Sequence, residues 1–214
     1  MSHENHTAAP LMNFPPELRR FDLRNGFDPA KIHSFAEAGG WGIGGYLENR
    51  AGMYTASHFG NRRTLHMGLD IWAKAGEPVF APLDGTVLYT EWHSRPGDYG
   101  GTLVIRHELD GSPIYALYGH LSRESSQKIL PGKAVKSGER IARLGREEEN
   151  GQWPPHLHLQ ISIRDPGSAD MPGVVDPADA TEAAILYPNP ERLIGPLPGT
   201  DFPLLNFRRL SHDE

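Results

Sequence analysis

The chain has 214 residues, of which 38% are hydrophobic and 22% are charged. This composition is typical of a globular protein and disfavours both a disordered chain and a membrane protein built from apolar helices. The formal net charge of −6 disfavours a basic footprint for nucleic acid, so we expect no nucleic-acid partner. The chain has no cysteine, which removes disulfides, zinc–thiolate sites and thiol catalysis from consideration.

The N-terminal residues are polar and carry neither the basic region nor the apolar region of a secretion signal. No apolar run approaches the roughly 18 residues that a membrane-spanning helix needs. We therefore expect a cytoplasmic protein with no membrane span. A secreted or periplasmic protein whose signal had been removed would have the same sequence features.

Turn-forming residues are frequent in the chain, which contains 24 glycines and 19 prolines among 214 residues. Such a content favours many short strands over long helices, so the fold is predicted to be mainly β. Residues 1–20 are polar and are expected to form a loose arm. A short helix is predicted over residues 28–38, with Asp28 as N-cap, Pro29 in the first turn and the pair Gly39-Gly40 as its end.

Strand signals are dense between residues 65 and 164. Short apolar or alternating runs occur there between Gly, Pro and Asp residues, at 86–89, 102–106, 114–118 and 156–163. A weak internal echo relates residues 75–79 to residues 131–135, and two such hairpin units suit a small sandwich or an open barrel. A second helix is predicted over residues 176–185, followed by a proline-rich segment.

Eleven histidines raise the question of which of them come together. Residues 156–163 alternate between polar and apolar side chains, which is the period of a strand. His156 and His158 then share one face with Gln160 and Ser162, about 6–7 Å apart along the strand, while Leu and Ile residues face a core. One imidazole can bind a metal ion while the other reaches water or substrate.

His66 and Asp70 are four residues apart and share a face in a strand or in a helix. Gly68 between them favours the extended form. Together with a third imidazole they would form a set of two histidines and one carboxylate, which leaves an open coordination position, as in catalytic zinc sites.

His120 ends an apolar, strand-like run, at a point where strands pass into loops and sites are commonly built. Taken alone, a histidine in a strand is more often a hydrogen-bonded structural residue, and His107 is interpreted in that way. The three segments together carry the functional interpretation.

These motifs, taken in order over about residues 57–163, resemble the lysostaphin-type family of zinc endopeptidases. The matching segments are residues 57–62 (Ser-His-Phe-Gly-Asn-Arg), 66–70 (His-Met-Gly-Leu-Asp), 76–87 (with Gly-Glu-Pro-Val-Phe-Ala-Pro), 99–100 (Tyr-Gly), 118–122 (Tyr-Gly-His-Leu-Ser) and 155–158 (Pro-His-Leu-His).

The resemblance implies that His66, Asp70 and His158 bind one Zn²⁺ per chain and that His120 and His156 are catalytic histidines outside the ligand set. It implies a mostly antiparallel sheet or open β-sandwich with a long groove, and a peptide substrate, often from peptidoglycan. Because every one of these positions is filled, the resemblance is to catalytic members rather than to non-catalytic activators. The catalytic domain is predicted over residues 46–195, between an N-terminal arm (1–45) and a C-terminal tail (196–214).

Two departures from the family pattern point to a particular branch. The loop over residues 146–154 is charged and contains Trp153, where the family usually has a short Gly/Ser/Thr loop. Residues 43–48, 149–156 and 187–195 look more like a branch found inside the cell, fused to a small-molecule kinase and an aminotransferase.

Three alternatives remain open. An intracellular zinc amidase would use the same chemistry on a small peptide or metabolite. A phosphocarrier is suggested by residues 76–87, which also resemble the hybrid motif of phosphocarriers and of biotinyl or lipoyl carriers, although Asp70 beside His66 would repel a phosphate. A non-catalytic module stabilised by zinc would need four protein ligands. The sequence identifies no protein partner.

Overall fold

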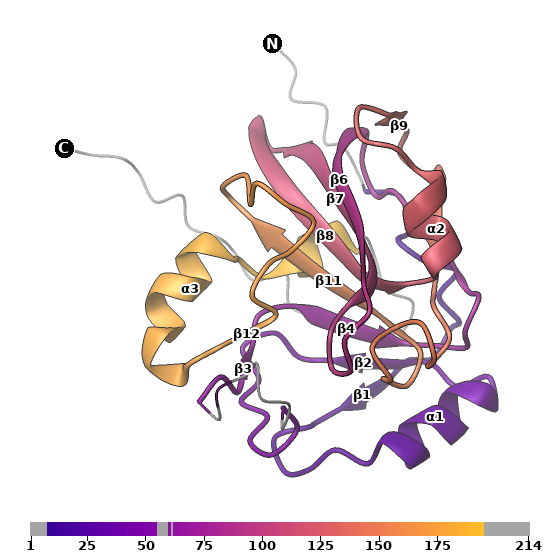
Figure 1. The fold of residues 1–214 in the computed structure, drawn as a ribbon, viewed down its shortest axis with the longest axis vertical. Coiled ribbons are helices and arrows are strands. Elements are labelled where there is room, and N and C mark those ends of the chain that lie inside the picture. The colour runs from indigo at the N-terminus through magenta and orange to yellow at the C-terminus, as the bar shows by residue number, and fades with distance from the viewer. Residues whose placement is uncertain (1–7, 55–59, 61, 195–214) are drawn as a thin grey trace.

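A computed structural model describes residues 8–54, 60 and 62–194 of the chain. Within these residues the fold is mainly β, with one eight-stranded sheet, two small two-stranded sheets and a few short helices (Figure 1). This confirms the predicted fold class. The predicted tail over residues 196–214 lies outside the described residues.

The main sheet is antiparallel except at one edge, where β1 and β2 run parallel. Its long central hairpin turns at Asp110 and Gly111, which both have a positive φ, as tight hairpin turns require. The order across the sheet is β1 (Arg19–Phe21), β2 (Gly42–Gly44), β4 (Leu69–Trp72), β11 (His156–Ser162), β8 (Ser112–Leu121), β7 (Gly100–Leu109), β6 (Gly85–His93) and β9 (Ala134–Val135).

Two small antiparallel sheets flank the main one. They pair β5 (Pro78–Phe80) with β10 (Arg140–Arg143), and β12 (Val174–Val175) with β3 (Leu65–His66). The echo seen in the sequence corresponds to a repeated turn, because β5 and β9 each follow a turn with a glycine at positive φ, Gly76 and Gly132.

The two predicted helices are present. Asp28 caps α1 (Pro29–Glu37) by accepting a hydrogen bond from the Lys31 amide at 3.1 Å, and Gly39 follows the helix with φ +86°. The second prediction corresponds to a 3₁₀ turn, η2 (Pro177–Asp179), which runs into α3 (Ala180–Leu186). Two further elements were not predicted, α2 (Arg123–Lys128) and η3 (Pro190–Leu193).

The principal core lies on one face of the main sheet. Leu157, Leu159 and Ile161 of β11 pack there with Ile71 and other apolar side chains, as the alternating pattern predicted. The prediction was wrong for Ile163, which is 46% exposed because β11 ends at Ser162. The opposite face of the same strands carries the candidate site.

The N-terminal region is integrated into the fold (Figure 1). Leu11 and Met12 are fully buried in the principal core, and the amide of Phe80 donates to Leu11 O at 2.9 Å. The expected loose arm is therefore wrong for this segment, because an apolar pair extends the edge of β5. The division of the chain at residue 46 stays a prediction, although β1 and β2 belong to the main sheet.

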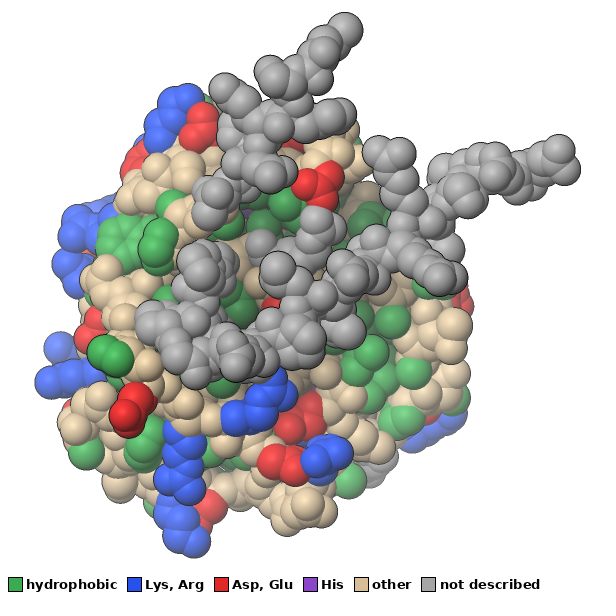
Figure 2. All heavy atoms as spheres, turned by 180° about the vertical axis from the view of Figure 1, so that it is seen from behind, with side chains coloured by type: hydrophobic (Ala, Val, Ile, Leu, Met, Phe, Trp, Pro, Cys, Tyr) green, Lys and Arg blue, Asp and Glu red, His purple; other side chains and the backbone are tan. Residues whose placement is uncertain are grey.

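The surface carries mixed charge. Figure 2 shows acidic and basic side chains interspersed around the margin of the rear face. In the part of the chain that the structure describes, no helix has the length and apolar character to cross a membrane.

Candidate active site

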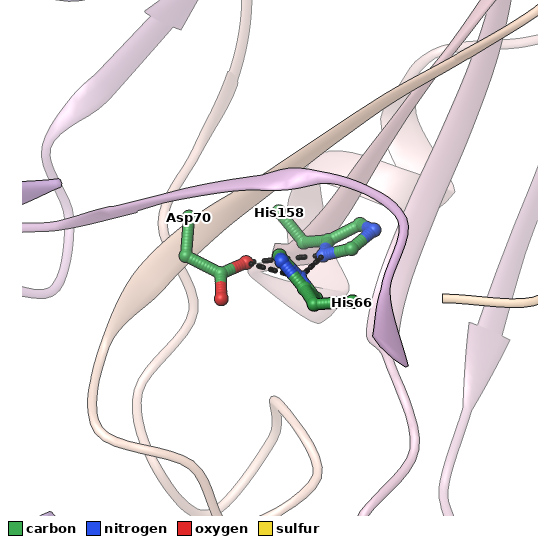
Figure 3. A group of neighbouring side chains, drawn as sticks. All are labelled: His66, Asp70 and His158. Carbon is green, nitrogen blue, oxygen red and sulfur yellow. Dashed lines mark hydrogen bonds and ion pairs between the residues drawn. The ribbon is translucent and has the colours of Figure 1, made fainter. Parts of the chain in front are cut away.

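Three side chains from neighbouring strands converge on one point, as Figure 3 shows. Asp70 of β4 and His158 of β11 are directly opposed in the sheet, so their side chains project from the same face. His66 reaches the same point from β3. A side chain at Gly68 would collide with the ring of His158, so glycine between the two motif residues lets His158 approach.

The three polar atoms form a compact triangle. His66 Nε2 lies 3.1 Å from His158 Nδ1 and 3.3 Å from Asp70 Oδ1, and His158 Nδ1 lies 3.0 Å from Asp70 Oδ1. Tetrahedral zinc with ligand bonds of about 2.0–2.1 Å separates its ligand atoms by roughly 3.3 Å. All three side chains are buried.

The far nitrogen of each imidazole fixes which nitrogen carries the proton. His66 Nδ1 faces Gly45 O at 3.0 Å, and His158 Nε2 faces Gln160 Oε1 at 3.1 Å. Both partners accept hydrogen bonds, so in the neutral rings these nitrogens carry the protons. The electron pairs of His66 Nε2, His158 Nδ1 and Asp70 Oδ1 therefore point at one another, an arrangement that fits a bound cation.

Burial and charge keep two members of this set, His66 and Asp70, in their ligating forms. Burial lowers the pKa of His66 to about 4. Burial alone would raise the pKa of Asp70, but His66 and Arg50 outweigh it and hold that pKa well below its ordinary value. His66 and Asp70 are thus in the protonation states that metal binding requires.

His156 lies beside this triangle. Its Nδ1 donates to Pro154 O at 2.7 Å, and its ring stacks on Trp72 with centroids 5.6 Å apart and planes inclined by 24°. Its Nε2 lies 3.9 Å from Asp70 Oδ1. The backbone carbonyl and the indole thus aim the unprotonated nitrogen of His156 at the candidate metal position.

A bulge brings His120 to the same face. Across β7 and β8 the register shifts, so that Gly119 and His120 face a single residue, Thr102. His120 has φ +59°, a left-handed conformation that is rare outside glycine. Strict alternation would put His120 on the core face with Tyr118, whereas the bulge turns it toward the pocket.

His120 and His156 form a close pair, with ring centroids 4.1 Å apart. His120 Nδ1 donates to Asn150 O at 2.9 Å, so its Nε2 is also unprotonated in the neutral ring. Burial, and then the neighbouring His156 and His158, lower the pKa of His120 well below its ordinary value. Burial likewise lowers the pKa of His156.

All five predicted site residues line one cavity of about 440 Å³. Met53, Tyr54 and Trp153 form an aromatic and apolar part of its wall. Trp153 comes from the unusual loop over residues 146–154 and packs edge-on against Tyr54. The remaining wall is mixed: it has polar side chains and an apolar segment over residues 171–174. The polar or charged members include Arg63, Arg95, Asp98, Tyr99, Ser168 and Asp170.

His107 has the structural role that the sequence indicated. Its Nδ1 donates to Asp84 O at 3.0 Å, and its Nε2 accepts from the Tyr118 hydroxyl at 2.9 Å. It lies within β7. Of the lead-in motif over residues 57–62, only Gly60 and Arg62 are described, and Arg62 pairs with Asp176 at 2.8 Å.

Sequence reasoning missed several groups that hold the site. The alternating pattern predicts Gln160 on the histidine face, and its spacing of two from His158 is the available signal for its role as acceptor. Nothing in the pattern singled out Arg50, whose Nη1 donates to Asp70 Oδ2 at 2.6 Å. The carbonyls of Pro154 and Asn150 depend on loop conformation and left no signal in residue type.

The model of Peptidase family M23 matches residues 64–170, which is half of the chain and includes all five site residues. The chain belongs to Peptidase family M23. This confirms the family resemblance drawn from the motifs, whereas the resemblance to the intracellular, fused branch stays a prediction.

Two curated relatives show the extent of the similarity. An uncharacterized metalloprotease of Haemophilus influenzae is 30% identical over 138 residues, which cover 61% of this chain and 27% of that protein. A DD-carboxypeptidase/endopeptidase, Mpg, of Neisseria meningitidis serogroup B is 34% identical over 99 residues, which cover 46% of this chain and 20% of that protein. The aligned segments therefore span about a quarter or less of the length of these relatives.

Among solved structures, the catalytic domain of the antimicrobial peptidase lysostaphin from Staphylococcus simulans is similar at 21% identity. The alignment covers 70% of this chain and 97% of that chain, with a TM-score of 0.41.

Proposed function

We propose that this chain is a zinc-dependent hydrolase of peptide amide bonds, with His66, Asp70 and His158 as the metal ligands. The observation that carries the proposal is the convergence of three buried electron pairs on one point. Without a cation, that arrangement would bring two imidazole electron pairs and a carboxylate together unfavourably.

An open coordination position separates this proposal from a structural zinc site. Among the described residues, the group of side chains that could jointly bind a metal has three members, His66, Asp70 and His158. Structural zinc sites use four protein ligands, whereas catalytic sites use three and leave room for water or substrate. The adjoining cavity supplies that room.

The neighbouring side chains are suited to proton transfer. Zinc bound here would polarise a substrate carbonyl and lower the pKa of water to about 7. His156 acts as the general base in this proposal, because its neutral ring presents Nε2 at 3.9 Å from Asp70 Oδ1. Burial lowers the pKa of this ring, so His156 is unprotonated at neutral pH and its Nε2 has an electron pair for a proton from the attacking water.

In this proposal His120 lies on the leaving-group side of the scissile bond, where it helps to protonate the departing amine. Its Nε2 faces the same cavity and carries no proton in the neutral form, so it can hydrogen-bond an oxyanion only after it has taken a proton up. With the two ring centroids 4.1 Å apart, charge repulsion disfavours protonating both rings together. The His156–His120 pair therefore holds one proton at a time. His156 takes that proton from the attacking water, and the pair then passes it to the leaving amine.

The proposed substrate is a short peptide of the peptidoglycan type. The Neisseria relative is named a DD-carboxypeptidase/endopeptidase, and we extend peptide-bond hydrolysis to this chain because both share the family. A second candidate substrate is a small peptide or metabolite amide, as expected for the intracellular branch. The apolar and aromatic wall formed by Met53, Tyr54 and Trp153 is compatible with such a substrate.

The test is metal analysis paired with hydrolysis. We expect about one zinc per chain after purification, loss of amide hydrolysis after chelation, and recovery with added Zn²⁺. A panel of peptidoglycan fragments, pentaglycine peptides and small amides identifies the substrate class. A protein that binds no zinc, or that hydrolyses equally well without metal, would contradict the proposal. Stable phosphorylation by a phosphocarrier would favour the carrier alternative.

A further inference from the structure

A buried arginine contacts the carboxylate of the candidate metal centre from behind. Arg50 is fully buried, and its Nη1 donates to Asp70 Oδ2 at 2.6 Å. Its Nε donates to Glu48 Oε2 at 2.7 Å, and Nη1 also contacts the Tyr54 hydroxyl at 3.2 Å. One guanidinium therefore lies between two buried carboxylates.

The surroundings of Arg50 hold the guanidinium in place. It lies 5.9 Å from the ring centroid of Trp72, the same indole that stacks on His156. A side chain at Gly44 would come within 3.0 Å of Arg50 Nη2, so the close approach depends on glycine at that position. Gly44 is also the register partner of Asp70.

This arrangement is poorly explained by stability alone. Among the described residues, the buried Arg50 Nη2 has no hydrogen-bond partner, and taking charged groups out of water offsets much of the attraction between them. A ligand carboxylate, by contrast, commonly needs a partner on its second oxygen to fix its orientation. The geometry of Arg50 meets that need.

We propose that Arg50 is a positioning residue for the metal centre. By occupying Asp70 Oδ2, it leaves only Oδ1 to face His66 and His158, so Asp70 binds the metal through one oxygen. Glu48 balances the charge of Arg50, so that the trio of Glu48, Arg50 and Asp70 keeps one net negative charge toward a divalent cation. This inference rests on the proposed function and deepens it.

The contacts extend the centre beyond the segment matched by the family model. Glu48 and Arg50 precede residue 64, where that match begins. Glu48 Oε1 in turn accepts a hydrogen bond from the Leu23 amide at 3.1 Å, in the connection between β1 and α1. The N-terminal region thus orients a metal ligand through Glu48 and Arg50.

Zinc affinity tests the inference in the full chain. Arg50→Lys keeps a positive charge but cannot contact both carboxylates in the same geometry, and Glu48→Gln/Arg50→Met removes both partner charges together. In each variant we expect the zinc dissociation constant, measured by chelator competition, to rise about 10- to 100-fold. Glu48→Gln alone is nearly isosteric but removes the charge that balances Arg50. It should raise the zinc dissociation constant by about three- to tenfold.

A spectroscopic measurement separates orientation of the ligand from general stability. With Asp70 Oδ2 released in the double variant, the carboxylate can bind Co²⁺ through both oxygens. The higher coordination number should weaken the visible absorption of the cobalt-substituted protein relative to the parent. Arg24→Lys, which alters the exposed pair with Asp22, is the matched control and should leave zinc affinity and cobalt spectrum unchanged.

Two results have different meanings. If the parent protein binds zinc and all three variants bind it within about twofold of the parent with unchanged cobalt spectra, Arg50 has no positioning role and only this inference fails. That holds even if thermal unfolding shows that the metal-free variants are less stable. If the parent itself binds no zinc, the proposed function fails first. Should the two Arg50 variants not fold, the zinc affinity of Glu48→Gln decides.

Discussion

His107 and His120 lie on adjacent strands and are both buried, yet the structure uses them differently. Each donates from Nδ1 to a backbone carbonyl, Asp84 O and Asn150 O respectively. The Nε2 of His107 is occupied by the Tyr118 hydroxyl in the core, whereas that of His120 faces the cavity. Burial alone therefore does not distinguish a structural histidine from a chemical one, but the environment of the second nitrogen does.

The largest loss of metal binding and activity is expected at the candidate metal centre, where His66 Nε2 and His158 Nδ1 lie close together. His158→Ala should lose zinc and with it the hydrolytic activity, because His66 and Asp70 alone form an incomplete ligand set. Metal content and turnover of the purified variant, with its fold checked by circular dichroism, measure this. Full zinc occupancy in His158→Ala would remove His158 from the ligand set.

His120→Ala tests the cavity-facing member of the comparison. We expect zinc content to be retained and turnover to fall by about 10²–10⁴-fold, the usual size of general acid–base catalysis. The measurement is turnover per bound zinc on the substrate identified by the panel. Unchanged turnover would make His120 a second structural histidine.

His107→Ala tests the structural histidine of the comparison. The variant loses packing and the hydrogen bonds of His107 with the Tyr118 hydroxyl and the Asp84 carbonyl, so the free energy of unfolding should fall by about 2–4 kcal/mol. Urea unfolding measures the loss. Turnover of the folded variant should match the parent, and a selective loss of turnover at unchanged stability would overturn the structural assignment.

A smaller effect on the stability of the metal-free protein is expected from lowering the pH. Burial lowers the pKa of His107, and that of His66 to about 4, whereas an unfolded histidine titrates near 6.5. Below about pH 6.5 the unfolded chain therefore binds more protons, and metal-free stability should fall by about 1.4 kcal/mol per pH unit for each imidazole still unprotonated in the fold.

Urea unfolding of the chelated protein at pH 7.5 and 5.5 checks this, with His107→Ala as the comparison. The variant should lose part of the pH dependence. Equal stability of the parent at the two pH values would show that the buried imidazoles titrate normally. Hydrolysis should decline only below the ordinary histidine value of about pH 6.5, because burial lowers the pKa of His66, His120 and His156.

The sequence contained the local patterns of the site. Alternation over residues 156–163 predicted which side chains of β11 share the histidine face, and the spacing of His66 and Asp70 predicted a shared face for them. These inferences succeeded geometrically because strand period depends on local residue types. Their assigned roles in zinc binding and catalysis remain proposals.

Local sequence patterns could not predict the features of the site that depend on pairing between distant segments. The bulge that turns His120 arises from the pairing of β7 with β8, and simple alternation would have put His120 in the core. Arg50 reaches Asp70 only after β2 pairs with β4. The burial of Leu11 and Met12 likewise depends on a distant edge strand, whereas the polar, proline-containing local sequence predicts a loose arm.

Anomalous diffraction at the zinc edge, from crystals grown with Zn²⁺, tests the central claim most directly. The account predicts one peak within about 2.0–2.2 Å of His66 Nε2, Asp70 Oδ1 and His158 Nδ1, with Asp70 Oδ2 still on Arg50. A crystal at saturating zinc with no peak there, or with the ion bound by other side chains, would contradict it.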